Sequence, residues 1–199
     1  MEAFLAASEP WLAARVAEAD RPSALGFDRP GVVWLGGEPV PVVRRGAGGV
    51  PEPVAARPGA ALRDGRLVVS GPDTAAAAAV DRWYRREARA QLEAAVATEA
   101  RRLAVTPARV AVRDTTSRFG SCSATGTLSF SWRLVVAPPE VLDYVVVHEL
   151  CHLREPNHGA GFWRLVAEAR PGFAAQRRWL NEHGRELLAY VPRLEPPLD

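Results

Sequence analysis

Three histidines and one glutamate lie close together in residues 148–158. The segment begins with the pattern H-E-x-x-H, in which two histidines are four residues apart. On a helix, residues at this spacing project from the same side, so both imidazoles can bind one metal ion. Glu149 lies about 100° further round the helix, where it can hold a metal-bound water more readily than it can become a ligand. We therefore predict that Glu149 is a general base.

A proline in the same segment indicates how a third ligand reaches the metal. Pro156 cannot continue a helix and biases Glu155 away from helical angles, so the chain should turn back soon after His152 and present His158. Three protein ligands and a water form a catalytic zinc site, whereas structural sites have four protein ligands, usually including cysteines. We predict that His148, His152 and His158 bind one Zn²⁺ per chain. The competing interpretation is a helix whose histidines only pack or cap.

Three further residues could bind a metal, and each has a simpler interpretation. Cys151 lies between the first two histidines and is expected to be a small buried hydrophobe. Cys122 could approach the metal as a thiolate or could have no such role. His183 is expected at the surface or at a helix end, because a fourth protein ligand would exclude the water.

The element that carries the first two ligands is predicted to be a buried helix. It begins at Pro138, with a second proline and an acid in the first turn, and residues 141–150 are apolar on nearly all sides. Before it, residues 128–136 alternate between apolar and polar side chains, which predicts a half-buried strand. Residues 117–123 and this strand either line the bound substrate or simply close the sheet.

The first half of the chain predicts a small sheet followed by a long helix. Residues 32–35 and 40–43 form an expected β-hairpin, and Pro39 and Pro41 predict an edge strand. Residues 61–63 and 66–70 form a second hairpin. The longest helix should begin at Asp73 as its cap and extend to about residue 103, with one packing face.

The remaining stretches are assigned more simply. We expect a short N-terminal helix in residues 4–19, a loop in residues 45–59, strand-like alternation at 110–112, and a Pro-rich tail. Two further helices are predicted near residues 162–170 and 174–188. The long helix carries an arginine cluster interleaved with acids, which we interpret as a solvated face in preference to a nucleic-acid contact: Arg82, Arg85, Arg86 and Arg89.

Composition favours an ordinary globular protein. The 199 residues are 48% hydrophobic and 24% charged, with a formal charge of +2, which excludes both a disordered and a strongly basic class. No apolar run reaches the roughly 18 residues of a membrane span, and the N-terminus is not typical of a signal peptide. With two cysteines, a disulfide framework is not expected. We predict a cytoplasmic protein with reduced thiols.

Several sequence words together resemble the YgjP-like metallopeptidase domain, a family similar to the SprT-like proteases within the zincin class. They are RFGSCS at 118–123, WRL at 132–134, DYVVVHELCHL at 143–153, NH at 157–158 and FW at 162–163. Phe119 stands where the family usually has Trp. Membership in the metzincins is not expected, because they have Gly where this chain has Glu155 and need a later methionine, whereas Met1 is the only Met.

The resemblance implies an α+β fold with a zincin-like metallopeptidase core. In this fold a small mixed or antiparallel sheet packs on the buried HExxH helix, after an N-terminal β-hairpin region and a long helix. We expect an N-terminal helix and β region in residues 1–72, the zincin-like domain in 73–190 and a tail in 191–199. The implied ligands are His148, His152 and His158, with Glu149 as base.

The implied activity is zinc-dependent hydrolysis of a peptide or protein substrate. The developing oxyanion needs a second electrophile, and the candidates for this or for lining the substrate are Arg118, Gly120, Ser121, Cys122 and Tyr144. Two alternatives are a SprT-like protease that acts on DNA-associated proteins and a zinc-containing binding or adaptor protein without turnover. A nucleic-acid partner is not favoured, a membrane partner is not expected, and the oligomeric state is left open.

Overall fold

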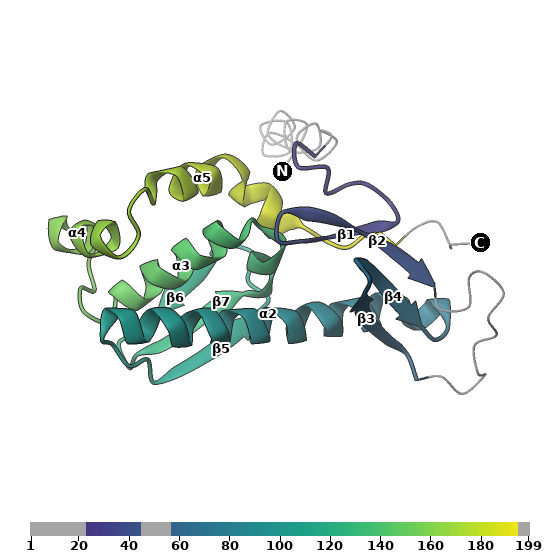
Figure 1. Cartoon of the computed structure of the whole chain (residues 1–199), viewed down its shortest axis with the longest axis horizontal. Coiled ribbons are helices and arrows are strands. Elements are labelled where there is room, and N and C mark those ends of the chain that lie inside the picture. The colour runs from purple at the N-terminus through teal and green to yellow at the C-terminus, as the bar shows by residue number, and fades with distance from the viewer. Residues whose placement is uncertain (1–22, 45–56, 195–199) are drawn as a thin grey trace, which may run out of the picture.

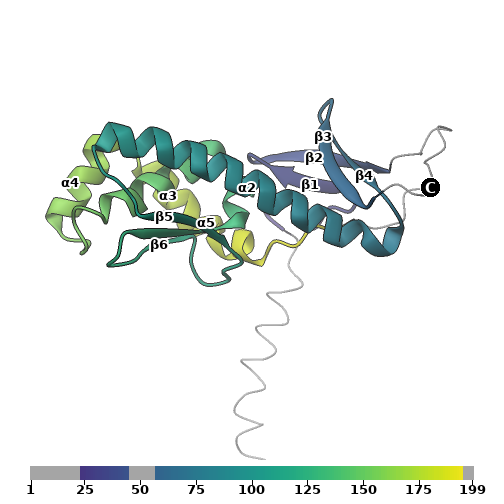
Figure 2. The ribbon, with the colours of Figure 1, turned by 90° about the horizontal axis from the view of Figure 1, so that it is seen from below.

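The long helix α2, Asp73–Leu103, extends along most of the molecule and packs on two separate β-sheets (Figures 1 and 2). The computed structural model describes residues 23–44 and 57–194. The expected N-terminal helix in residues 4–19, most of the expected loop and the end of the tail lie outside these described residues. The combination of helices with two small sheets confirms the predicted α+β class.

The N-terminal sheet has four strands in the order β1-β2-β4-β3. The strands are β1 Val32–Leu35, β2 Glu38–Arg44, β3 Gly59–Arg63 and β4 Arg66–Ser70. Both predicted hairpins are present, and each has antiparallel pairing. Asp64 and Gly65 connect β3 to β4 with φ angles of 47° and 72°, as a type I′ turn requires.

The prediction that the proline-containing strand lies at the sheet edge is wrong, because β2 pairs with both β1 and β4. The β4 pairing begins only at Val42, after both prolines. Val42 N donates to Gly31 O at 2.9 Å, and by alternation the nitrogens of Pro39 and Pro41 point away from β1. Both prolines therefore lack an N–H only on the side of β2 that faces β4, at positions where β4 is not paired with β2.

The start of α2 also differs in detail from the prediction. Pro72 is the N-cap, and no side chain caps this helix end. Asp73 is instead the first helical residue and forms an ion pair with Arg44 on β2 at 2.7 Å. A carboxylate in the first turn still interacts favourably with the helix dipole. Within the helix, Arg85 pairs with Asp81 at 2.8 Å, while the interpretation of the arginine cluster as a solvated face stays a prediction.

The second sheet has three strands in the order β5-β7-β6 and packs on α2 and α3. They are β5 Arg109–Arg113, β6 Gly120–Cys122 and β7 Thr127–Ser131. The sheet is mixed, because β7 is parallel to β5 and antiparallel to β6. Among the described residues, β6 pairs with β7 alone, so its other side is an open edge.

The strand predicted over residues 128–136 ends at Ser131, and a 3-10 helix, η1 Trp132–Val136, follows. The hydroxyl of Ser131 accepts a hydrogen bond from Arg133 N, which begins the helical turn. All five residues of η1 are buried between α2, α3 and α5. The alternation predicted one exposed polar face, but Arg133, its polar residue in this stretch, is buried too.

Three helices complete the fold: α3 Pro139–Cys151, α4 Ala160–Ala169 and α5 Ala174–Ala189. As predicted, α3 begins with a proline in its first turn and is buried on most sides, and it contacts α2, α4, α5, η1 and β6. Buried residues of both sheets, α2 and α3 form one hydrophobic core, while the domain boundary at residue 72 stays a prediction.

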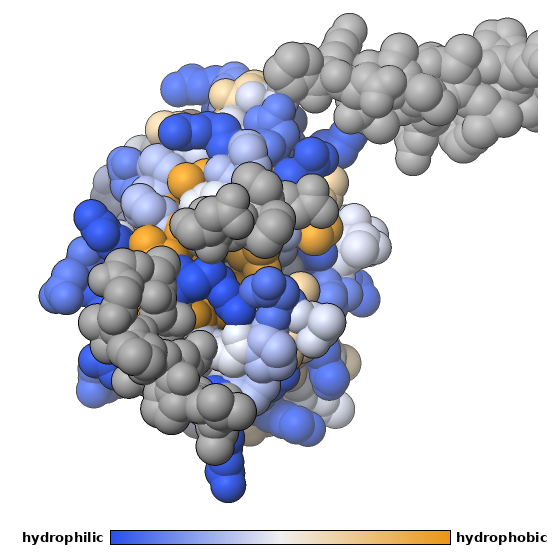
Figure 3. All heavy atoms as spheres, turned by 90° about the vertical axis from the view of Figure 1, so that its right-hand side faces the viewer, coloured by the Kyte–Doolittle hydropathy of each residue, from blue (hydrophilic) through white to orange (hydrophobic). Residues whose placement is uncertain are grey.

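The surface at the end formed by the four-stranded sheet is largely hydrophilic, with scattered hydrophobic residues (Figure 3). No helix within residues 23–44 and 57–194 is both long and apolar enough to span a lipid bilayer.

Candidate active site

The three histidines of residues 148–158 meet at one point beside the open edge of β6. Nε2 of His158 lies 2.9 Å from Nε2 of His148 and 3.1 Å from Nε2 of His152. They form the one group of metal-ligating side chains found among the described residues. Two nitrogens bound tetrahedrally to one zinc lie about 3.3 Å apart, so the three imidazoles fit a single divalent ion.

The chain turns at the second histidine, as predicted. Helix α3 ends at Cys151, and His152 is its C-cap, so the second histidine is at the helix end. The carbonyl oxygen of Glu155 accepts a hydrogen bond from Nδ1 of His152 at 3.1 Å. A carbonyl can only accept, so the proton is on Nδ1 and the lone pair of Nε2 points at the other two imidazoles.

The surroundings keep His148 and His152 neutral, as metal ligation requires. Burial lowers the pKa of His148 to about 3, and the neighbouring His152 and His158 act in the same direction. Burial likewise lowers the pKa of His152, against the opposing hydrogen bond to Glu155. At neutral pH both therefore present lone pairs.

Glu149 lies beside this group but is not part of it. Its side chain is only 6% exposed and packs directly on the backbone of Gly120 in β6. A Cβ on Gly120 would lie 2.5 Å from Oε1 and 2.7 Å from Cγ of Glu149, which is closer than real side chains approach. Glycine at this strand position therefore makes room for the carboxylate. Burial raises the pKa of Glu149 to about 7, while the charge of Arg118 opposes this shift.

The histidines and Glu149 border a cleft of about 730 Å³. Its other walls come from β6, from the turn between β6 and β7, and from residues just before β5. A group of three histidines with a buried carboxylate, open to a cleft, has the parts needed for metal-assisted hydrolysis.

Comparison with protein families identifies the chain. The model of the YgjP-like metallopeptidase domain matches residues 1–183. The chain belongs to this family. The predicted resemblance is thereby confirmed, and membership in a metallopeptidase family implies a divalent metal and a peptide or protein substrate.

Among solved structures, the chain is similar to the crystal structure of the metallopeptidase zymogen of Pyrococcus abyssi abylysin. The sequence identity is 24%, the match covers 47% of this chain and 96% of that chain, and the TM-score is 0.42. A search of curated proteins gave no match.

The other predicted site residues of this YgjP-like chain lie around Glu149. Gly120, Ser121 and Cys122 form β6 and line the cleft. Tyr144 is on α3, one turn before His148, and its ring centroid lies 5.9 Å from that of His148. Burial raises the pKa of Tyr144, so its hydroxyl remains protonated at neutral pH and can donate a hydrogen bond.

The remaining sulfur and nitrogen candidates stay outside the histidine group. Cys151 is 1% exposed, as expected for a small buried hydrophobe. Cys122 is half-buried, and burial raises the pKa of its thiol, with the charge of Glu149 acting in the same direction. His183 is on α5 beside Trp179 and is not in the metal-ligating group of the described residues.

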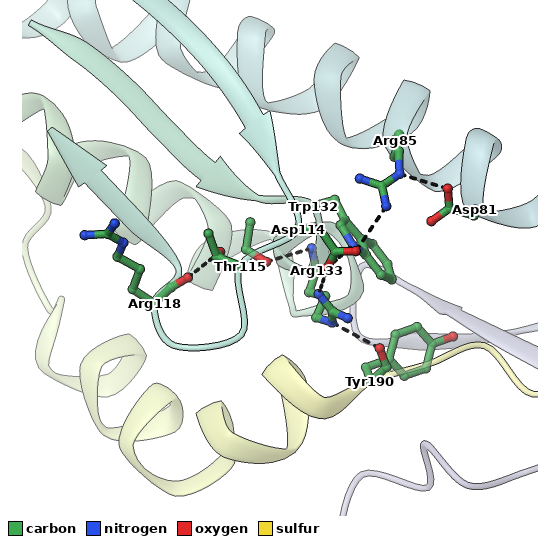
Figure 4. Close-up of polar contacts among 9 residues, drawn as sticks. Asp81, Arg85, Asp114, Thr115, Arg118, Trp132, Arg133 and Tyr190 are labelled. Carbon is green, nitrogen blue, oxygen red and sulfur yellow. Dashed lines mark hydrogen bonds and ion pairs between the residues drawn. The ribbon is translucent and has the colours of Figure 1, made fainter. Parts of the chain in front are cut away.

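A polar cluster that the sequence did not reveal holds the loop before β6 (Figure 4). The carboxylate of Asp114 accepts hydrogen bonds from Arg133, from Trp132 Nε1 at 3.1 Å and from Arg85 Nη2 at 3.1 Å. Arg133 is 7% exposed and also donates to the carbonyl of Tyr190 at 3.1 Å. The hydrogen bond from Arg133 is the main reason that the pKa of Asp114 is lowered.

From Asp114 the loop leads directly to Arg118. Thr115 Oγ1 donates to the carbonyl of Arg118 at 2.7 Å, which closes a tight turn (Figure 4). The ring of Phe119 then packs on Gly184 of α5, where an added Cβ would lie 3.1 Å from it. The loop is thus fixed at both ends. The one hint in the sequence is Arg133, a charged residue in an otherwise apolar stretch. An arginine that is buried there needs an acidic partner.

Proposed function

We propose that the protein is a zinc-dependent peptidase in which His148, His152 and His158 hold the zinc and Glu149 is the general base. The observation that carries the proposal is the convergence of three Nε2 atoms, 2.9 and 3.1 Å apart, beside one buried carboxylate. All-nitrogen ligation by three imidazoles suits zinc better than magnesium or calcium, which prefer oxygen ligands.

The protein's own groups would supply the proton transfers. When bound, zinc acts as a Lewis acid that polarises the scissile carbonyl and makes a water more acidic. Glu149 accepts the proton of the attacking water and delivers it to the leaving amine nitrogen. Its packing against Gly120 leaves the carboxylate little freedom, so it is oriented before substrate binds.

The open edge of β6 provides a place for the substrate backbone. Phe119 O accepts from Ser131 N, and Ser123 N donates to Thr127 O, at 2.8 and 2.9 Å. By the alternation of antiparallel strands, the N–H and C=O groups of Gly120 and Cys122 point away from β7. An extended peptide can add to this edge as a further strand, which would place its backbone next to Glu149.

Three groups near Glu149 are candidates for stabilising the oxyanion. Arg118 is exposed, and its charge acts on Glu149. The protonated hydroxyl of Tyr144 approaches from the α3 side, and its pKa responds to the charge of Glu149. The outward N–H groups of β6 are the third candidate.

The substitution Glu149→Gln tests this proposal. We expect it to retain bound zinc and to lower hydrolysis of an unfolded protein substrate by about 10²- to 10⁴-fold, because the amide cannot accept the proton. Glu155→Gln is the matched control, since Glu155 is exposed and only its carbonyl contacts His152. Zinc content is measured by elemental analysis. Equal turnover in both variants would exclude Glu149 as base, and no turnover in the wild type would favour a binding protein.

A further inference from the structure

One aromatic side chain contacts all three histidines of the site. The ring centroid of Phe162 lies 4.8 Å from that of His148, 4.5 Å from that of His152 and 4.6 Å from that of His158. The His152 ring is stacked on it at 26°, while the other two meet it near the perpendicular, at 72° and 77°. Phe162 itself is fully buried. It therefore forms a common platform for the three imidazoles.

Hydrogen bonds alone do not orient these rings. His152 is held by the carbonyl of Glu155. Nδ1 of His148, however, is buried and has no hydrogen-bond partner among the described residues. A metal-binding histidine is usually oriented through this second nitrogen, by a carboxylate, a carbonyl or a water. For His148, contacts with the rings of Phe162 and Tyr144 orient the imidazole instead of such a hydrogen bond.

The platform is itself fixed. Phe162 is in the first turn of α4, which begins two residues after His158, so the platform and the third histidine are carried by one short segment. At the other end of this helix, Arg170 forms an ion pair with Asp143 of α3 at 2.6 Å. Helix α4 is therefore held against the helix that carries His148.

We propose that Phe162 is a positioning residue that holds the three imidazoles converged before the metal binds. The inference rests on the proposed function, because it takes the three histidines as the zinc ligands. Ordering three side chains costs conformational entropy, and a platform that orders them in advance removes this cost from metal binding. Loss of the flat ring should therefore weaken zinc binding even where the fold is kept.

The test compares zinc affinity in Phe162→Leu and Phe162→Met with that in Phe27→Leu. Leu and Met keep most of the buried volume but lose the aromatic plane. Phe27 is the matched control, because it is 8% exposed and its ring packs on Trp34 and Tyr190, away from the histidines. Affinity is measured by competition with a chromogenic chelator, and thermal unfolding of the zinc-free proteins reports the cost to the fold.

We expect both Phe162 variants to bind zinc at least about tenfold more weakly than the wild type, with Phe27→Leu unchanged. Wild-type affinity in the folded Phe162 variants would overturn the inference and leave the proposed function intact. Equal weakening in Phe27→Leu would also overturn it, since general destabilisation would then explain the loss. If the wild type binds no zinc, the proposed function itself fails. If Phe162→Leu does not fold, the zinc affinity of Phe162→Met tests the inference, because the flexible Met side chain fits the space left by the ring more easily.

Discussion

The contact between Gly120 and Glu149 predicts that a single methyl group should disable the site. In Gly120→Ala, the new Cβ would lie 2.5 Å from Oε1, 2.7 Å from Cγ and 2.9 Å from Cδ of Glu149. These three nearest atoms all belong to one side chain. The strand itself can therefore keep its place, and the carboxylate has to move.

The size of the movement follows from these distances. Ordinary contact begins at 3.4 Å, so the oxygen at 2.5 Å must retreat by about 0.9 Å. Because Cγ is also too close, a rotation of the terminal carboxylate is not enough, and the whole side chain has to change rotamer. A displacement of about 1 Å in a catalytic group can cost on the order of 100-fold in rate, or about 2.7 kcal/mol of transition-state stabilisation.

Steady-state hydrolysis and zinc analysis check this prediction. We expect kcat of Gly120→Ala to fall about 100-fold while KM and zinc content stay close to wild type, since neither the histidines nor the outward backbone groups are touched. Gly59→Ala is the control, because Gly59 is also a strand glycine and an added Cβ there makes ordinary contacts, with Ser70 Oγ at 3.4 Å and Arg57 O at 3.8 Å. A Gly120→Ala enzyme with kcat within a few-fold of wild type would refute the packing argument.

Two further predictions concern metal binding and acid stability. His158→Ala should lose zinc on dialysis while His183→Ala retains it, which elemental analysis can show; full retention in His158→Ala would remove His158 from the ligand set. For Asp114, whose pKa is lowered in the folded state by Arg133, the stabilisation is present above its unfolded pKa of about 4 and is lost as the pH falls below it. Asp114→Asn should therefore unfold at a lower temperature than wild type at pH 7, and this difference should shrink as the pH falls below about 4; a constant difference would contradict the linkage.

The parts of the site that are local in sequence were predictable. The four-residue spacing of His148 and His152 fixes their common side of a helix, and Pro156 makes a nearby turn necessary. The structure places His158 with them, although the helix ends earlier than Pro156 requires. The two hairpins and the helices were also predictable, because turn residues and helical periodicity act over a few neighbours.

The parts that depend on distant contacts were not predictable. Alternation continues from Phe130 to Val136, but the strand ends at Ser131, whose hydroxyl accepts from Arg133 N and begins a 3-10 turn that packs against distant elements. Asp114 meets Arg85 and Arg133, and no local pattern pairs these residues. Gly120 was expected to offer backbone donors, whereas the structure also shows that its missing side chain makes room for Glu149.

Strand β6 contributes to the proposed chemistry in two ways. One face of Gly120 is packed against the carboxylate, and the outward N–H and C=O groups of Gly120 and Cys122 form the edge to which a peptide would pair. A substrate paired with this edge would share one rigid element with the base, so the distance between its backbone and the carboxylate would be set by strand geometry. The loop from Asp114 to Phe119 is fixed at both ends, which holds this strand against α3. Substitutions in that loop should therefore affect kcat without removing zinc.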